Sequence, residues 1–260
     1  MIGIEGIPII KEGDDLSEII HKAIENSGLS LMDGDVLVVT HKIVSKAEGR
    51  VVELESVKPS KRAVKLARIA RKPARFVELA LREASSVVKL VKGHLITETH
   101  HGWFYSCSGV DLSNVSGGSS AVLLPKDPDE SAEKIRKGIR RLTGKDVAVL
   151  ISDTTGRPLR KGDIDVAIGV SGMKPILDLR GKKDGFGYTL RLKRIAVADE
   201  LASAAELVMG QSDEMIPVAV IRGYRYERCE RSSSDGLKRS KDKDIFLKGG
   251  EEELLGWLQG

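Results

Sequence analysis

The sequence predicts an α+β fold with mixed, largely antiparallel sheets and packed helices. Apolar runs of strand length alternate irregularly with amphipathic segments of helix length. Three short apolar runs between residues 86 and 108 are joined by tight turns, which indicates an antiparallel meander. The chain holds neither a GxGxxG nor a GxxxxGK(S/T) motif, so the sequence disfavours dinucleotide-binding and P-loop folds.

Capping signals predict the first helix. Asp15 can accept hydrogen bonds from a helix N-terminus, Glu18 stands at the capping-box position, and Gly28 ends the helical periodicity. The apolar residues between them follow the 3.6-residue period of a helix. A buried strand is predicted next, at residues 34–40.

The following segment is predicted to hold two helices and the meander. The helices, at residues 59–72 and 73–85, each begin near a proline, which favours the first turn of a helix. The three meander strands are predicted at residues 86–91, 94–98 and 102–108.

The second half of the chain alternates in the same irregular way. Asp127 and Pro128 mark the start of a helix that Gly144 ends. An Ala-rich helix is predicted later in the chain, and its small residues permit close packing. The sequence predicts strands at residues 121–125, 148–151, 165–170 and 217–223 and the Ala-rich helix at residues 195–210.

The composition of the C-terminal segment suggests a domain boundary. Residues 1–228 are expected to form one domain. Residues 229–260 begin as a polar, basic, serine-rich linker, and a short helix is predicted at residues 251–258.

Composition and the N-terminal residues predict a cytoplasmic protein. Of 260 residues, 41% are hydrophobic, which is enough for a substantial core. The two cysteines, Cys107 and Cys229, form no CxxC pair, which is typical of a reducing compartment and argues against structural zinc. The chain begins without the basic and apolar regions of a signal peptide and has no run of 18 apolar residues, so no membrane association is expected.

Positive charge is concentrated in one segment, although the net charge is only +4. Residues 50–92 carry twelve lysines and arginines against four acids. A solvated helical face is the simplest interpretation, and attraction of an anionic small molecule is the second. Nucleic acid is the least favoured partner, because the segment has one aromatic residue, Phe76, and no known binding motif.

Small oxygen-bearing side chains follow the predicted strand at residues 148–151. We expect this strand to end at Ile151, so that Asp153 and Thr154 emerge into a cleft with Arg157 and Arg160 nearby. A carboxylate and hydroxyls beside cations suit Mg²⁺ or Mn²⁺ bound together with phosphates. The alternative is an Asx or ST turn in which the aspartate caps its own backbone.

Two further segments have the same character. Residues 107–120 offer Asp111 and Asn114 with paired glycines, and residues 38–50 offer His41 and Lys46 at the end of a strand. Turn chemistry and a structural histidine are the alternatives to a ligand-binding role. No Ser/His/Asp order at useful spacing and no glycine elbow is present, so acyl transfer by a serine nucleophile is not expected, and no residue is predicted to be catalytic.

Six motifs in consistent order resemble the coenzyme F-420-0:L-glutamate ligase family, the gamma-glutamyl ligases of deazaflavin coenzyme biosynthesis. The resemblance extends from about residue 4 to residue 223 and takes the form of a stand-alone archaeal member. The motifs are EGIPII, VVTHKIVSKAEGR, GVDLSNV, SDTTGRPLRKGDIDVAIGVSG, VADELASAAELVMGQ and IPVAVIRG.

The resemblance implies GTP-dependent amide formation through an acyl phosphate, adding one glutamate to the deazaflavin precursor and then a second through a gamma linkage. It further implies a homodimer whose chain forms two intertwined lobes, a Mn²⁺ or Mg²⁺ ion, K⁺, and GTP as co-substrate. Thr155, Leu159 and Ser108 depart from residues that are more common in the family. Another nucleotide-dependent carboxylate-amine ligase and a non-catalytic nucleotide- or RNA-binding protein are the alternatives.

The resemblance also assigns site residues. The implied metal ligands are Asp111, Asp153, Thr154 and Gln211. The implied nucleotide contacts are Ile7, Pro8, Ile9, Ile10, His41, Lys42, Lys46, Asn114, Met209, Gly210, Gln211, Ser212, Asp213, Glu214, Met215 and Ile216.

Overall fold

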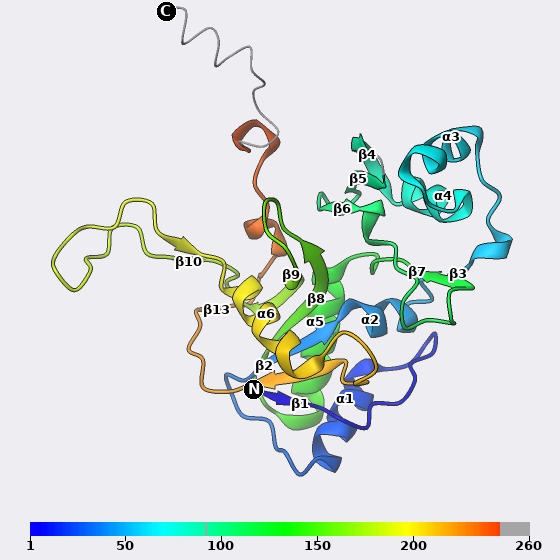
Figure 1. The fold of residues 1–260 in the computed structure, drawn as a ribbon. Helices are drawn as coiled ribbons and strands as arrows, with labels where there is room; N and C mark the ends of the chain where they lie inside the picture. Colours follow the sequence, from blue (N-terminus) through cyan, green and yellow to red (C-terminus); the bar gives the residue numbers. More distant parts are fainter. Residues whose placement is uncertain (92, 245–260) are drawn as a thin grey trace, which may run out of the picture.

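A mixed six-stranded sheet forms the centre of the computed structural model, which describes residues 1–91 and 93–244 (Figure 1). Strands β2 and β8 are parallel, and the other neighbouring pairs of this sheet are antiparallel. The α+β class with largely antiparallel pairing is therefore confirmed. The order is β1 (Ile2–Gly3), β12 (Val218–Ile221), β2 (Val36–Thr40), β8 (Ala148–Gly156), β9 (Asp163–Met173) and β13 (Arg228–Cys229).

Helices cover both faces of this sheet. Helices α1 (Leu16–Asn26) and α5 (Pro128–Thr143) pack on one face, and α6 (Val197–Met209) packs on the other (Figure 1). Successive strand residues point to opposite faces, so Leu37 belongs to the first core and Val38 to the second. Both faces of the central strands are thus buried, which explains their unbroken apolar runs.

Local capping signals correctly predicted two of these helices, α1 and α5. The side chain of Asp15 accepts hydrogen bonds from the backbone N–H groups of Ser17 and Glu18 at the start of α1. At α5, Asp127 accepts from the N–H of Glu130, and Gly144 ends the helix in the left-handed conformation. Each cap satisfies backbone groups that a helix end would otherwise leave unpaired.

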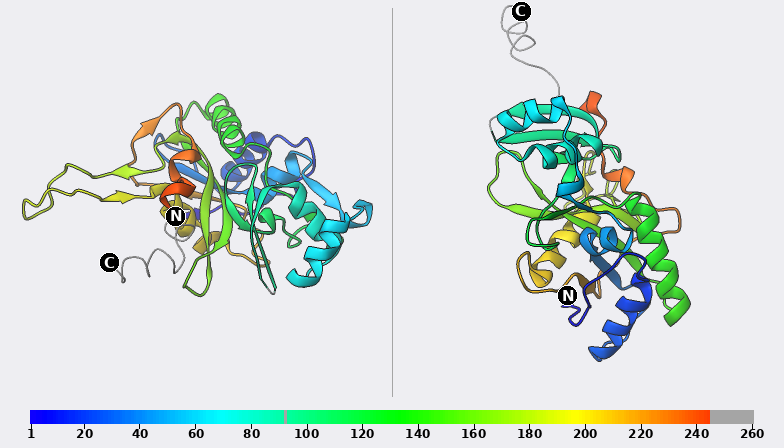
Figure 2. Two further views of the ribbon diagram at one scale, coloured as in Figure 1. Left: turned by 90° about the horizontal axis from the view of Figure 1, so that it is seen from above. Right: turned by 90° about the vertical axis from the view of Figure 1, so that its right-hand side faces the viewer.

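A smaller assembly lies at one end of the molecule (Figure 2). Helices α3 (Lys61–Ala70) and α4 (Ala74–Arg82) share a core with the antiparallel sheet β4-β5-β6, which confirms the predicted meander. Its strands are β4 (Ala84–Val91), β5 (His94–Thr99) and β6 (Phe104–Ser106). On α3 the buried residues are alanines and the cations Arg62, Lys65 and Arg68 are exposed, as expected of a solvated helical face.

Short elements connect the two parts. Strand β3 (Val51–Glu53) pairs with β7 (Ser120–Val122), and helix α2 (His41–Ala47), which the sequence did not predict, begins directly after β2. Single 3₁₀ turns are η1 (Leu54–Ser56), η2 (Cys107–Gly109), η3 (Ser234–Leu237) and η4 (Lys241–Lys243).

The predicted end of the strand at Ile151 is wrong. Strand β8 continues through Gly156 and forms a long antiparallel ladder with β9, in which Asp153 pairs with Val166 and Thr154 with Asp165. A register shift between Ile151 and Ser152 marks the change from apolar to polar residues. Pairing with β9 satisfies the backbone hydrogen bonds of residues 152–156, so these residues do not need a turn. Thr154 and Thr155 also favour a strand, because threonine has a high β-propensity. Asp153 therefore lies within a strand instead of in a loop.

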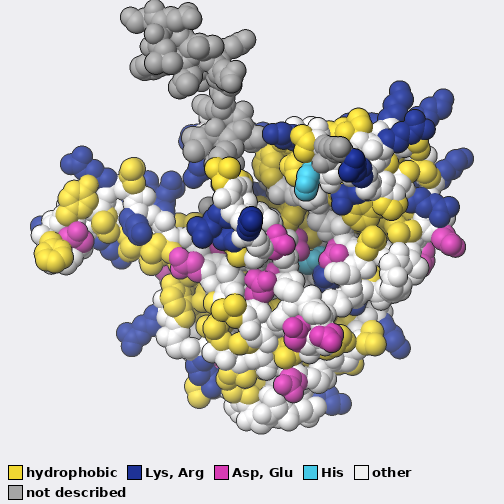
Figure 3. Space-filling model, in the orientation of Figure 1, with side chains coloured by type: hydrophobic (Ala, Val, Ile, Leu, Met, Phe, Trp, Pro, Cys, Tyr) yellow, Lys and Arg dark blue, Asp and Glu magenta, His cyan; other side chains and the backbone are white. Residues whose placement is uncertain are grey.

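An extended arm, residues 174–196, projects from the body at the end opposite α3 and α4 (Figure 2). The arm is a two-stranded ribbon of β10 (Leu177–Asp178) and β11 (Arg194–Ile195), which the sequence did not predict. Its tip exposes Phe186 and Tyr188, and Leu192 is exposed further back along the returning segment. Apolar and basic side chains are prominent on this arm in the space-filling view (Figure 3).

The segment after β12 returns to the main body. Asp129, at the start of α5, accepts hydrogen bonds from the N–H and the hydroxyl of Ser234, which is buried. The guanidinium of Arg136 donates two hydrogen bonds to Glu230. The helix predicted at residues 251–258 lies outside the described residues. None of the helices within the described ranges has the length and apolar character that crossing a bilayer requires.

Candidate active site

A cavity of about 640 Å³ opens where the parallel strands β2 and β8 approach their carboxyl ends. Ligands commonly bind at such ends, because side chains there leave the sheet in one direction. Segments far apart in the sequence meet around this cavity. It is lined by residues 7–10, 112–115, 209–212 and 214–217 and by Thr40, His41, Lys42, Ile43, Lys46, Gly117, Gly118, Asp153, Thr154 and Asp165.

The structure brings most of the predicted site residues together around this cavity. Every predicted nucleotide contact except Asp213 lines it, as do the predicted metal ligands Asp153, Thr154 and Gln211. Asp111 lies at its edge, bound to the lysine Lys42 that does line it. The assignment of these residues to a nucleotide or an ion remains a prediction.

Asp153 is one of two buried acids that line the cavity, with 8% of its surface exposed. Its Oδ1 accepts a hydrogen bond from the N–H of Thr154 and lies 3.1 Å from Nε2 of His41. Its Oδ2 is buried and has no hydrogen-bond partner among the residues that the structure describes. A buried carboxylate oxygen without a partner is costly, so this atom is poised to bind a polar or cationic group in the cavity.

Tyr105 adds to the polar character beneath the cavity. Burial, and after it the negative charge of Asp153, raises the pKa of Tyr105 well above the ordinary value. The hydroxyl is buried and faces the carboxylate of Asp153, and Nδ1 of His41 is buried with no hydrogen-bond partner among the described residues. Unpaired polar atoms therefore gather around one carboxylate, which is unusual in a protein interior and typical of functional sites.

Asp165 is a site residue that sequence reasoning missed. It lies opposite Thr154 on β9, is 4% exposed, and accepts hydrogen bonds from the hydroxyls of Ser152 and Thr154 and from Nε2 of Gln211. The sequence contained one signal that could have identified Asp165, namely a carboxylate at the start of the apolar strand predicted at residues 165–170. Such a residue needs partners, but only the pairing of β8 with β9 identifies them.

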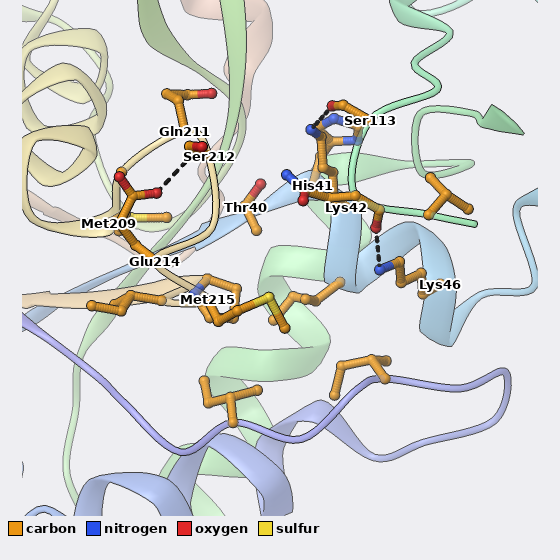
Figure 4. Close-up of a pocket in the computed structure, with 18 of the residues that line it drawn as sticks. Thr40, His41, Lys42, Lys46, Ser113, Met209, Gln211, Ser212, Glu214 and Met215 are labelled. Carbon is orange, nitrogen blue, oxygen red and sulfur yellow. Dashed lines mark hydrogen bonds between the residues drawn. The ribbon is translucent and has the colours of Figure 1, made fainter. Parts of the chain in front are cut away.

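Two lysines form the opposite side of the cavity (Figure 4). Lys42 and Lys46 are four residues apart on α2 and so share one helix face. Nζ of Lys42 donates to Oγ of Ser113 at 2.6 Å and lies 2.8 Å from Oδ2 of Asp111, and Nζ of Lys46 donates to the carbonyl oxygen of Asn114 at 2.7 Å. These contacts draw the loop after η2 toward α2.

Burial and neighbouring charges shift the pKa values of Lys46 and Asp111 on the lysine side of the cavity. Burial first, and then the charge of Lys42, lowers the pKa of Lys46. For Asp111, burial alone would raise the pKa, but the hydrogen bonds from Lys42 and from the backbone N–H of Ser113 outweigh it, so the pKa is lowered. Asp111 is therefore held as a carboxylate beside a cation.

The loop after α6 forms another wall of the cavity (Figure 4). Gly210 has a φ of +72°, and a Cβ at this position would lie 2.2 Å from Cδ of Glu214. Oε2 of Glu214 accepts a hydrogen bond from the N–H of Ser212, so the tight turn depends on glycine. Met215 and Ile216 continue this wall, and residues 7–10 add a second apolar stretch to the lining.

The oxygen atoms of the cavity fit a hard divalent cation that shares its coordination with phosphates. Within the described ranges, no three or more His, Cys, Asp or Glu side chains are arranged to hold a metal by themselves. Asp153 nevertheless offers an unpaired oxygen, and Oγ1 of Thr154 lies 3.1 Å from Oε1 of Gln211. Adjacent ligands of an octahedral Mg²⁺ ion with bonds of ~2.1 Å are about 3 Å apart.

Comparison with known proteins agrees with the motifs. The family model described as F420-0:Gamma-glutamyl ligase matches residues 4–223. The Coenzyme F420:L-glutamate ligase of Methanothermobacter thermautotrophicus is 44% identical over 250 residues, covering 95% of this chain and 98% of the relative. The enzyme of the same name from Methanocaldococcus jannaschii is 46% identical, covering 95% and 96%, and that of Archaeoglobus fulgidus is 43% identical, covering 94% of each.

The chain matches these relatives over nearly its full length, and its cavity places lysines opposite oxygen donors. It is therefore an enzyme of the ligase class. The chain belongs to the F420-0:gamma-glutamyl ligase family. The resemblance predicted from the six motifs is thereby confirmed.

Proposed function

We propose that this cavity catalyses the GTP-dependent addition of L-glutamate to coenzyme F420-0. The reaction type follows from membership of the family. One feature of the cavity gives the main structural support. Lys42 and Lys46 face the same cavity as the oxygen donors Asp153, Thr154 and Gln211. A polyphosphate between these two sides would meet cations from the protein on one side and an ion-binding oxygen set on the other.

In this proposal the nucleotide lies in the cavity between an apolar wall and the two lysines. Residues 7–10 with Met215 and Ile216 offer an apolar wall for the base and ribose. The ammonium groups of Lys42 and Lys46 are point charges for phosphate oxygens. In this arrangement each lysine exchanges a contact with the loop at residues 113–114 for a contact with the nucleotide.

A divalent Mn²⁺ or Mg²⁺ ion would be held by Asp153, Thr154 and Gln211, with Asp111 reaching it from the loop beside Lys42. When bound, the ion would neutralise charge on the phosphate oxygens. K⁺ is also part of the proposal, without assigned side chains. The fit of the oxygen set and the unpaired Oδ2 of Asp153 support the divalent ion.

The reaction needs no protein nucleophile. The terminal carboxylate of F420-0 attacks the γ-phosphorus of GTP, and GDP leaves with the electron pair of the broken P–O bond. The amine of L-glutamate then attacks the carbonyl carbon of the acyl phosphate, loses a proton as the amide forms, and displaces inorganic phosphate. Two anions must approach each other in the first step, so the lysines lower the barrier by holding the phosphates.

Water must be kept from the acyl phosphate, because hydrolysis would waste it. Apolar side chains of the lining, among them Ile7, Ile10 and Ile43, can exclude water around the reacting atoms once substrates fill the cavity. The chain itself therefore binds, orients and desolvates, and the substrates supply both nucleophiles.

We also propose that the protein is a homodimer. The arm at residues 174–196 exposes Phe186 and Leu192 far from the body, and apolar side chains exposed in this way commonly mark an interface. A two-stranded ribbon is marginally stable by itself in water, so a second copy packed against the arm would stabilise it.

One experiment tests the reaction directly. The protein is incubated with GTP, Mn²⁺, L-glutamate and F420-0, and mass spectrometry follows the addition of one or two glutamyl residues. Asp153→Asn should abolish product formation, whereas the matched variant Asp163→Asn, at an exposed position outside the cavity lining, should retain it. Absence of product with the unaltered protein, or full activity of Asp153→Asn, would contradict the proposal.

A further inference from the structure

We propose that Asp165 is a positioning residue: it orients Thr154 and Gln211 toward the divalent ion and does not itself bind that ion. The inference rests on the proposed function, because Thr154 and Gln211 matter here as ion ligands. No motif suggested this role, since Asp165 reaches its partners only through the pairing of β9 with β8 and through the loop after α6.

The hydrogen bonds of Asp165 distinguish it from Asp153. Its Oδ1 accepts from Oγ1 of Thr154 at 2.8 Å and from Nε2 of Gln211 at 2.9 Å, and its Oδ2 accepts from Oγ of Ser152 at 2.8 Å. Both oxygens are therefore satisfied by the protein. Asp153, in contrast, keeps one buried oxygen without a hydrogen-bond partner within the described part of the chain. Two neighbouring acids thus have separate roles, one available to a cation and the other already occupied.

The bond from Gln211 fixes which end of the amide faces the cation site. Because Nε2 donates to Asp165, the amide oxygen Oε1 is turned toward Thr154, 3.1 Å from Oγ1. Without an acceptor at position 165, the amide could rotate and offer its NH₂ group, which repels a cation. Asp165 therefore selects the orientation that coordinates.

The bond from Thr154 has a similar effect. Its single hydroxyl proton is within reach of two acceptors, Oδ1 of Asp165 and Oε1 of Gln211. The charged acceptor is also the nearer one, so the proton points to Asp165. The lone pairs of Thr154 are then free for an ion, as are those of Gln211.

Asp165 is itself held firmly. Its backbone N–H donates to Oε2 of Glu206, and its carbonyl oxygen accepts from the hydroxyl of Ser203, both on α6. Together with its burial, these bonds leave the carboxylate little freedom. A fixed acceptor of this kind is the usual device for orienting metal ligands, and its loss typically costs ten- to a hundredfold in metal affinity.

The test measures Mn²⁺ affinity from the electron paramagnetic resonance signal of free Mn²⁺, with the full-length protein and a non-hydrolysable GTP analogue. Asp165→Ala and Asp165→Ser remove the two-oxygen acceptor, and each is expected to weaken Mn²⁺ binding roughly ten- to a hundredfold. Asp165→Asn keeps one carbonyl oxygen for Thr154 and Gln211, while its amide can donate to Ser152, so it should restore most of the lost affinity.

Turnover gives a second readout that a purely structural role would not produce. In Asp165→Ala, the Mn²⁺ concentration needed for half-maximal activity should rise, with kcat recovering at saturating Mn²⁺ and KM for L-glutamate unchanged. A loss of folded protein would instead lower kcat at every Mn²⁺ concentration. Asp163→Ala, two residues earlier on β9 and exposed, is the matched control and should behave like the unaltered protein.

Three results would overturn the inference. Unchanged Mn²⁺ affinity in Asp165→Ala would show that the residue does not act on the ion. Equal losses in Asp165→Asn and Asp165→Ala would identify Asp165 as a ligand through its charge. Failure of both Asp165→Ala and Asp165→Ser to fold would assign it a structural role. An unaltered protein that forms no product would contradict the proposed function instead, so the two failures are distinguishable.

Discussion

Nε2 of His41 lies 3.1 Å from Oδ1 of Asp153, and both side chains are buried. The parallel register explains this contact, because Thr40 on β2 pairs with Ser152 on β8 and the next residue of each chain segment is His41 or Asp153. The two residues are 112 positions apart in the sequence, yet one pair of strands brings them together. His41 therefore lines the cavity mainly as the neighbour of Asp153.

This contact predicts that His41 acts on Asp153 more than on the nucleotide. His41→Ala should lower kcat/KM about ten- to a hundredfold, as expected when a polar neighbour of the carboxylate proposed to bind the metal is removed. Mn²⁺ affinity should fall in parallel, whereas the affinity for GTP without metal should change little. The matched control is His21→Ala on α1, whose ring faces Glu25 away from the cavity lining. A His41→Ala enzyme with unaltered Mn²⁺ affinity would refute this role.

Replacement of Lys46 tests the phosphate side of the cavity. Lys46→Met removes a cation while keeping the aliphatic stem, so KM for GTP should rise while KM for L-glutamate stays constant. A hydrogen bond to a charged group contributes about 1.5 to 3 kcal/mol, which corresponds to roughly ten- to a hundredfold in affinity. Steady-state kinetics against each substrate measure the change. Lys22→Met, on an exposed position of α1, is the control, and equal effects of the two variants would exclude a local role for Lys46.

The lowered pKa of Lys46 predicts a dependence on pH. Burial and the charge of Lys42 favour the neutral amine, so Lys46 loses its proton at a lower pH than an exposed lysine does. In the proposed function the protonated form of Lys46 binds phosphate, so KM for GTP should be lowest below this pKa and rise as the pH increases through it. Lys46→Arg should abolish that alkaline rise, because a guanidinium keeps its proton. Identical alkaline limbs in the two proteins would rule out Lys46 as the titrating group.

The sequence predicts those parts of the fold that short-range signals determine. Asp15 and Asp127 cap helices α1 and α5 within three residues of themselves, and the meander follows from strands joined by tight turns. The extension of β8 to Gly156 could not be predicted in the same way. A strand of serine, aspartate and threonine forms there because β9 pairs with it, and pairing is not a property of the segment alone.

The candidate site shows the same division. Family motifs indicated the residues around the cavity, because a motif is recognised from the sequence alone and does not require the local secondary structure to be predicted. Asp165 was overlooked since its significance arises from three partners on β8 and in the loop after α6. The arm at residues 174–196 was also missed, because its long polar turn carries no helical or strand periodicity.

The turn at Gly210 predicts a localised effect on nucleotide binding. Gly210→Ala places a Cβ against Glu214, which must move and release the N–H of Ser212, so the wall of the cavity shifts. KM for GTP should rise severalfold. Gly181→Ala in the arm is the control for a residue with positive φ (+81°), since among the described residues no atom lies within 4 Å of the new Cβ. Similar KM values for GTP in both variants would show that the contact with Glu214 is unimportant.

The arm predicts how two copies associate. Residues 174–194 carry seven lysines and arginines against two acids, whereas residues 196–221, which include α6, carry five acids and no lysine or arginine. We therefore expect the arm of one copy to lie along the α6 side of its partner, with Phe186 and Leu192 covered on association.

Phe186→Ser combined with Leu192→Ser should convert the dimer to a monomer in light scattering, and high salt should weaken the dimer of the unaltered protein. Leu159→Ser is the control, because Leu159 is 96% exposed at the tip of the β8–β9 hairpin and lies outside the arm. A monomeric unaltered protein, or a dimer that survives the double substitution, would remove the arm from the interface.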